Sequence, residues 1–169
     1  MKPRIRLQLI PDKYRLPFAA AVLSCSLLAA FFISWSQGAF ASGYVVIGDD
    51  IRVQVEVAST AKTREKGLSG REQLGSGQGM LFVFLRPDRY TFWMKDMKFP
   101  IDILWIKGEE LVDMTTDVPV PVPGEDLPSF FPVSPADKVL EVPAGFAQAH
   151  GLRTGMTVIT HIDSRRQVR

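Results

Sequence analysis

A succession of short apolar runs, separated by turn residues, constrains the fold of this chain most strongly. Residues 51–57 alternate strictly between apolar and polar side chains, which indicates a half-buried strand. Similar runs rich in aromatic and β-branched residues cover residues 80–85, 91–97, 101–106, 111–116, 138–142 and 157–163. We therefore expect a mainly β domain, either a compact antiparallel β-sandwich or a partly open barrel.

One or two short helices are expected beside these strands. Thr60 can cap a helix over residues 61–66 that ends at Gly67, and residues 144–150 can form a second. Because short turns separate the runs between residues 80 and 116, the pattern predicts an antiparallel meander there. The following residues, 117–136, contain six prolines and should form an extended surface loop.

The first 41 residues are predicted to be a signal peptide or an uncleaved membrane anchor. A basic head precedes an apolar run over residues 16–35, and Ala39-Phe40-Ala41 has the small-x-small form that signal peptidase accepts. The run is close to the ~20 residues that a membrane helix needs, so it could instead anchor the chain to the inner membrane. A further alternative is acylation at Cys25, as in a lipoprotein. Residues 42–169 are then expected to form a single exported domain, periplasmic or otherwise extracytoplasmic.

The charge of the chain offers no argument for a nucleic-acid partner. The whole chain has 20 basic and 18 acidic residues, but five of the basic residues and one of the acidic ones lie in residues 1–41. That leaves 15 against 17, a net charge of about −2, for the rest. Membrane contact is expected only through the N-terminal segment. Since Cys25 is the only cysteine, residues 42–169 offer no disulfide and no thiolate metal site.

The segment between residues 92 and 102 places charged residues among apolar ones. In an ideal strand Trp93 and Lys95 share a face, and Asp102 on the next strand could lie near them. A tryptophan platform beside a cation and a carboxylate suits a sugar or another small polar molecule. The alternative is a structural ion pair of Lys95 with Asp102 or Glu141, with Trp93 in the core.

Two arginines flank the turn at Gly67. The guanidinium groups of Arg64 and Arg71 could together hold a carboxylate or phosphate. Alternatively, they clamp the adjacent loop by bonding backbone carbonyls or Glu141.

Five motifs in this chain resemble, in the same order, those of the family called domain of unknown function 192, a group of uncharacterised exported bacterial and archaeal proteins. The motifs are Arg64-x-x-Gly67-Leu68-x-x-Arg71, Gly79-Met80-Leu81-Phe82, Trp93-Met94-Lys95 with Pro100-Ile101-Asp102, Leu140-Glu141-x-Pro143-Ala144-Gly145, and Gly151-x-x-x-Gly155. The resemblance implies a compact, mainly β domain over roughly residues 51–163. The chain departs from it at Asp96, Met97 and Met156, where the family usually or often has asparagine, threonine and aspartate.

Three functions follow as hypotheses. The preferred one is a non-catalytic domain that binds a small polar ligand or an envelope glycan through Arg64, Arg71, Trp93, Lys95, Asp102 and Glu141. The second is a protein-interaction module that uses the proline-rich loop 119–135, with Phe130 and Phe131 as exposed anchors. The third is a hydrolase that uses Asp96, Asp102 and Glu141 as acid and base.

Enzymatic and metal-dependent functions have weaker support in the sequence. Neither a Gly-x-Ser-x-Gly elbow nor a Walker-type phosphate loop occurs, so we favour a protein that is not an enzyme and expect no cofactor. His150 and His161 lack the paired spacing of zinc ligands, and we expect no metal. Methionines 80, 94, 97, 114 and 156 could bind Cu(I), but methionine among aromatic residues more often fills gaps in a core.

Overall fold

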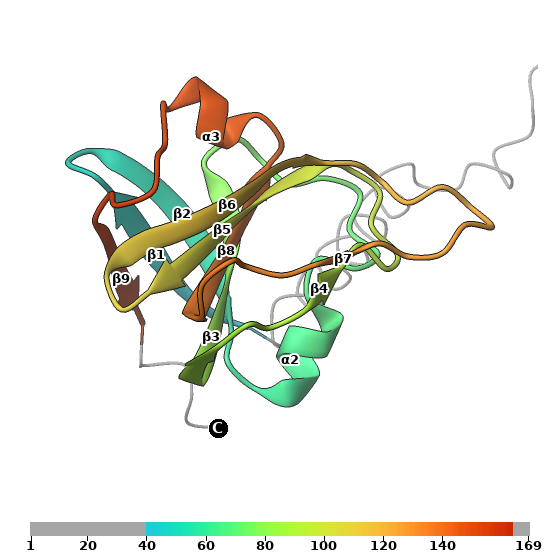
Figure 1. Cartoon of the computed structure of the whole chain (residues 1–169), viewed down its shortest axis with the longest axis horizontal. Coiled ribbons are helices and arrows are strands. Elements are labelled where there is room, and N and C mark those ends of the chain that lie inside the picture. Colours follow the sequence, from blue (N-terminus) through green and yellow to red (C-terminus); the bar gives the residue numbers. More distant parts are fainter. Residues whose placement is uncertain (1–39, 164–169) are drawn as a thin grey trace, which may run out of the picture. The chain divides into compact units, whose positions relative to one another are not determined.

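The structure is a computed structural model that describes residues 40–163. Over this range the chain forms nine strands and two short helices (Figure 1). The strands are β1 (Ala41–Ile47), β2 (Ile51–Ala58), β3 (Gln78–Asp88), β4 (Phe92–Trp93), β5 (Ile101–Lys107), β6 (Glu110–Val118), β7 (Ser129–Phe130), β8 (Ala136–Pro143) and β9 (Val158–Ile162). The helices are α2 (Ala61–Lys66) and α3 (Phe146–Ala149). The predicted mainly β class is confirmed.

Seven strands form one sheet in the order β6-β5-β8-β3-β2-β1-β9, and β4 pairs with β7 in a separate small sheet. All neighbours are antiparallel except β2 and β3, which run parallel. The meander predicted for residues 80–116 is wrong, because β8 lies between β3 and β5, and of the strands in that range only β5 and β6 pair with each other. The expected strand at 91–97 shortens to Phe92–Trp93, since the chain turns after it and Asp96 adopts a left-handed φ of 56°.

The large sheet curls into a partly open barrel. Its two edge strands, β6 and β9, come together at one end, where Glu110 and Thr157 form an isolated antiparallel bridge. The Leu111 backbone N–H donates to the Met156 carbonyl over 3.0 Å, and the Val158 N–H donates to the Glu109 carbonyl over 2.8 Å. These bonds cover only that end, so the barrel stays open along the rest of β6 and β9.

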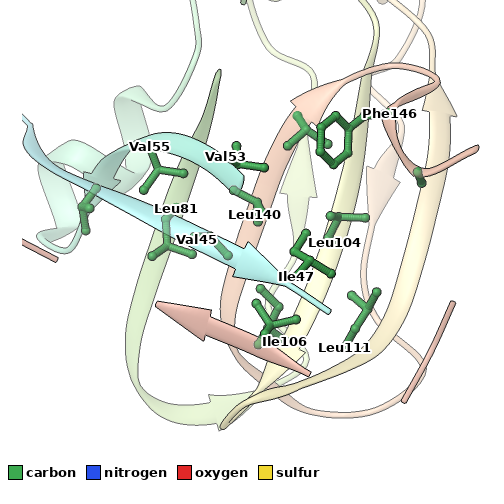
Figure 2. Close-up of a cluster of buried hydrophobic side chains, with 14 residues drawn as sticks. Val45, Ile47, Val53, Val55, Leu81, Leu104, Ile106, Leu111, Leu140 and Phe146 are labelled. Atoms are coloured by element: carbon green, nitrogen blue, oxygen red, sulfur yellow. The ribbon is translucent and has the colours of Figure 1, made fainter. Parts of the chain in front are cut away.

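The interior of the curled sheet holds the first of two hydrophobic cores. Every strand of the large sheet contributes to it, and α3 closes one end with Phe146 and Ala147. Figure 2 shows Val45, Leu81, Leu104 and Leu140 among the side chains that converge there. These residues alternate along their strands with others that point to the outer face.

The second core lies on the outer face of β3, β5 and β8. It contains Met80, Phe82, Ile103, Trp105 and Val139 from those strands, covered by residues of the loop after α2 and of the segments around β4 and β7. In Figure 1, α2 lies beside β4 and β7, away from α3. Strand β5 is therefore buried on both faces, which explains its nearly continuous apolar sequence.

Local capping signals position α2 against this outer face. The Thr63 N–H donates to Thr60 Oγ1 over 3.1 Å, the Thr60 N–H donates to Thr63 Oγ1 over 3.0 Å, and the helix ends at Gly67 with a φ of 46°. The predicted helix and both of its signals are confirmed. Beyond it, Ser69 Oγ and the Gly70 N–H donate to the carbonyls of Lys95 and Asp96, each over 2.8 Å. The loop after α2 is thereby fastened to the segment after β4.

The predicted signal or anchor, including residues 16–35 and Cys25, lies outside the described residues except for Phe40 and Ala41. Among the helices of residues 40–163, none has the length and apolarity needed to cross a bilayer.

Candidate functional site

A pocket of about 190 Å³ opens between α2, β3 and residues 90–93 on the outer face of the sheet. Apolar and aromatic side chains form most of its wall. Its lining residues are Arg64, Glu65, Lys66, Gly67, Leu68, Ser69, Phe82, Phe84, Tyr90, Thr91, Phe92, Trp93, Met97 and Glu141. Three of the six predicted site residues are thus brought together here, namely Arg64, Trp93 and Glu141.

Glu141 is the buried polar group of this pocket. It lies on β8 directly opposite Met80 of β3 on one side and Ile103 of β5 on the other, and both neighbours belong to the outer core. Directly opposed residues share a face, so the Glu141 side chain points toward the pocket. It is only 5% exposed, and no residue between 40 and 163 donates a hydrogen bond to its carboxyl group. Burial raises the pKa of Glu141 to about 8, because the charged form loses its solvation.

Aromatic rings pack against one another around the pocket. Phe82 and Phe92 make an edge-to-face contact with centroids 4.9 Å apart, and Phe84 stacks on Tyr90. Trp93 alternates with Phe92 along β4, so its side chain points outward and is 53% exposed at the rim. The wall is held in place by its own packing, while Trp93 offers a free apolar surface.

Arg64 borders the pocket and also bonds the backbone. Its Nη1 donates to the carbonyls of Ser59 and Val83, the latter over 3.0 Å, and its guanidinium lies 4.9 Å from the Phe84 ring centroid. These contacts fix the side chain where β3 meets α2. They correspond to the predicted alternative in which this arginine bonds backbone carbonyls.

Arg71 lies elsewhere. Its two terminal nitrogens each donate to one Glu56 carboxylate oxygen over 2.6 Å, and this pairing raises the pKa of Arg71. The guanidinium also lies over the Phe40 ring. Arg71 does not line the pocket, so the structure does not bring the two predicted guanidinium groups together around one ligand.

Asp102 is fully buried and bonds backbone groups on the other face of the sheet. One carboxylate oxygen accepts from the N–H groups of Asp117 and Gly145 over 2.8 and 3.3 Å, and the other from Ala147 over 2.8 Å. Since Ile103, the next residue, shares a face with Glu141, Asp102 must point to the opposite face. Its role is to fasten the turn before α3 and the end of β6 to β5.

Lys95 is exposed and lies outside the pocket, and within residues 40–163 it pairs with neither Asp102 nor Glu141. Asp96 is exposed as well. Because Asp102 and Glu141 project from opposite faces, they do not form the pair of facing carboxyl groups that the hydrolase hypothesis requires.

The remaining predictions concern the proline-rich loop and metals. Phe130 is not an exposed anchor, because it pairs with Phe92 across β4 and β7 and packs against the outer core, whereas Phe131 is exposed. Within the described range, no three side chains of His, Cys, Asp or Glu gather as a metal site would require. The methionines divide between the two cores: residues 80, 94 and 97 lie in the outer core, and residues 114 and 156 pack against the interior one.

Sequence reasoning missed Phe84 and Tyr90 as pocket residues. Both belong to alternating pairs, Phe82 with Phe84 and Tyr90 with Phe92, and that spacing places each pair on one face of an extended segment. The spacing was a usable signal for an aromatic surface, but it does not show which segments face each other.

Comparisons with known proteins agree on the domain. Residues 44–160 match the model of the family DUF192, described as uncharacterized ACR. A crystal structure from Sinorhizobium meliloti 1021, described as a candidate transcription regulator, is similar at 26% identity and a TM-score of 0.65, covering 72% of this chain and 95% of that one. A protein of unknown function from Novosphingobium aromaticivorans DSM 12444 is similar at 28% identity and a TM-score of 0.61, covering 69% and 83%. No curated protein matches this chain.

Proposed function

The chain belongs to the DUF192 family, and we propose that its domain binds a small polar ligand, free or as part of an envelope glycan, in the pocket between α2, β3 and residues 90–93. Binding requires no reaction at the site. The observation that carries the proposal is a buried carboxyl group that no residue between 40 and 163 bonds and that borders a pocket with aromatic walls. Among residues 40–163 no side-chain nitrogen or oxygen that is fully shut off from solvent lacks a hydrogen-bond partner, so the small exposed part of Glu141 is its contact with the pocket. A carboxyl group with so little access to water is poorly solvated, and a polar ligand in the pocket would bond it.

The dimensions of the pocket support a small ligand. An apolar cavity of about 150 Å³ can accommodate benzene, so a pocket of about 190 Å³ suits one ring or a chain of similar size. Trp93 at the rim could stack on a larger ligand that extends outward, such as the next sugar of a glycan. The proposed ligand-binding residues are accordingly Glu141, Trp93 and Arg64, supported by the aromatic wall.

We also propose that this domain acts outside the cytoplasm. The support is the basic head, the apolar run over residues 16–35 and the small-x-small motif that ends at Ala41. Fractionation of cells that express the full chain would test it. Recovery in the periplasm or with the inner membrane is expected, and recovery with the cytoplasm would contradict it.

A thermal-shift screen of the full chain against sugars, peptidoglycan fragments, organic acids and small amines tests ligand binding. A ligand at a hundred times its dissociation constant adds about 2.7 kcal/mol of stability, which moves the unfolding midpoint by several degrees. Trp93→Ala should reduce the shift, whereas Leu85→Ala should not, because Leu85 is a fully exposed apolar residue outside the pocket. No shift with any class of compound, or an equal loss in both variants, would count against the pocket.

A protein-interaction module is the second candidate. Its support is a group of large exposed apolar side chains within the loop 119–135, namely Val120, Val122, Leu127, Phe131 and Val133. Exposed apolar groups of this kind often mark interaction sites. Replacing Phe131 and Val133 with serine should abolish partner capture while the pocket still binds its ligand, which separates this candidate from the first.

A further inference from the structure

We infer that the pocket selects a small organic cation, whose ammonium group pairs with the Glu141 carboxylate beside the aromatic rings. This inference rests on the proposed function and goes further by naming the charge of the ligand. Preferential binding of a neutral sugar would support the proposed function and contradict this inference.

Within the described range, the residues around Glu141 offer its carboxyl group no hydrogen-bond donor, so a ligand would have to supply one. On its own face, β3 and β5 present Met80 and Ile103, which carry no hydrogen-bond donor in their side chains. A carboxylate accepts hydrogen bonds at two oxygens, so an ammonium group with three N–H donors matches it well. This charge-assisted hydrogen bond is stronger than one between neutral groups.

The aromatic wall favours the same ligand charge. Phe82, Phe92 and Trp93 border the pocket that Glu141 also borders. The face of an aromatic ring carries negative charge density and attracts a cation placed within about 6 Å of its centre. A carboxylate and several rings around one small space therefore act together on a positive charge, whereas a neutral ligand gains only from their apolar surface.

The other titratable groups of the pocket lie on α2 and before β4, whereas Glu141 lies on β8. They are Arg64, Glu65 and Lys66 on α2 and Tyr90 ahead of β4. The Arg64 guanidinium donates to two backbone carbonyls, and Lys66 Nζ donates to the Ser69 carbonyl over 2.8 Å. These bonds hold the two cations in place without neutralising them, and Glu65 offsets one of the two charges, so the attraction for a cationic ligand must come from Glu141 and the rings.

Benzylamine and benzyl alcohol form a matched pair of probes, because they have nearly the same shape and only the first is charged. We would measure both by calorimetry on the full chain between pH 6 and pH 9. The carboxyl must lose its proton to pair with the ammonium group, so the affinity for benzylamine should rise by about tenfold per pH unit up to about pH 8 and then level off. At pH 8, benzylamine should bind at least about tenfold more tightly than benzyl alcohol.

Two variants identify the source of this preference. Glu141→Gln keeps the shape of the side chain, so it should remove the pH dependence and weaken benzylamine at pH 8 by about tenfold or more, with benzyl alcohol unchanged. Trp93→Leu keeps an apolar surface at the exposed rim without a ring, so it should weaken benzylamine several-fold more than benzyl alcohol. If Glu141→Gln does not fold, Trp93→Leu still tests whether the pocket prefers a cation.

Equal binding of the two probes at pH 8 would overturn cation selection and leave the ligand-binding proposal standing. An affinity for benzylamine that Glu141→Gln does not change would overturn it as well. Binding of neither probe, with no thermal shift from any compound class, would instead remove the proposed function itself.

Discussion

Asp102 and Glu141 lie on the neighbouring strands β5 and β8, yet their carboxyl groups project from opposite faces of the sheet. Asp102 accepts three backbone hydrogen bonds beside the interior core, whereas Glu141 borders the pocket on the outer face and receives none from residues 40–163. The two buried carboxyl groups of residues 40–163 therefore differ in what they do. Substitution of Asp102 should destabilise the fold, whereas substitution of Glu141 should change the ligand affinity and the pH dependence of stability.

Asp102→Ala should lower the free energy of unfolding by at least about 3 kcal/mol. The substitution leaves the N–H groups of Asp117, Gly145 and Ala147 without their acceptor, and one unsatisfied buried donor costs roughly 1–3 kcal/mol. Urea unfolding measures the change. Asp96→Asn is the control, because Asp96 is exposed and asparagine tolerates its left-handed backbone. Similar stabilities for the two variants would contradict the role assigned to Asp102.

Stability should fall as the pH rises from 4.5 to 8 because of Glu141. The unfolded chain releases this proton near pH 4.5, but the folded protein keeps it up to about pH 8. In that window the folded state binds more protons, so each step upward in pH favours unfolding, and the loss is complete above pH 8. The total is on the order of 5 kcal/mol.

Glu141→Gln isolates this effect from all other titrating groups. The variant carries no proton at this position, so it should resemble the original protein near pH 4.5 and exceed its stability by several kcal/mol at pH 9. Denaturant unfolding at pH 4.5, 6, 7.5 and 9 provides the comparison. A constant difference between the two proteins across this range would show that Glu141 titrates normally.

Arg71→Ala should reduce stability by about 1 kcal/mol and leave the affinity for a pocket ligand unchanged. The Arg71–Glu56 pair is bidentate, but both side chains are partly exposed, so its contribution is modest. A double-mutant cycle with Glu56→Gln measures the coupling energy, and calorimetry with benzylamine measures the affinity. A marked loss of affinity in Arg71→Ala would show that Arg71 contributes to ligand binding and would contradict this prediction.

Gly79→Ala should destabilise the domain by about 1–3 kcal/mol through overpacking. A methyl group at this position would lie 2.8 Å from the backbone oxygen of Glu141 and 3.1 Å from a methyl carbon of Val53. Thermal unfolding compares this variant with Ser76→Ala, whose site is exposed. Equal midpoints would mean that β2, β3 and β8 can separate enough to admit the extra carbon.

The elements with local signals could be predicted from the sequence. The helix Ala61–Lys66 begins after a threonine that caps it and ends at a glycine, and both signals act within one turn of the chain. Strand β2 alternates from Ile51 to Val57 because one face is buried. The order of the strands has no comparable signal. Strand β8 begins 29 residues after the end of β5 and still lies between β3 and β5, so the expected meander was wrong.

The candidate site was predictable in part for the same reason. Polar or aromatic residues that interrupt apolar runs identified Trp93 and Glu141, which border the pocket. The sequence could not show that Asp102 faces the other way, since that depends on the register of β5 against β8. Nor could it show that Arg71 bonds Glu56, fifteen residues earlier, in preference to a ligand.

The pairing of β1 with β9 has a consequence for how the chain folds during synthesis. Strand β1 is the first strand of the described residues, and one of its two neighbours in the sheet is the last strand, β9 (Val158–Ile162). Until that segment is available, β1 has an unpaired edge and the interior core lacks Val158. A growing chain cannot complete the barrel in stages, so an incomplete chain should display an open strand edge to chaperones and proteases.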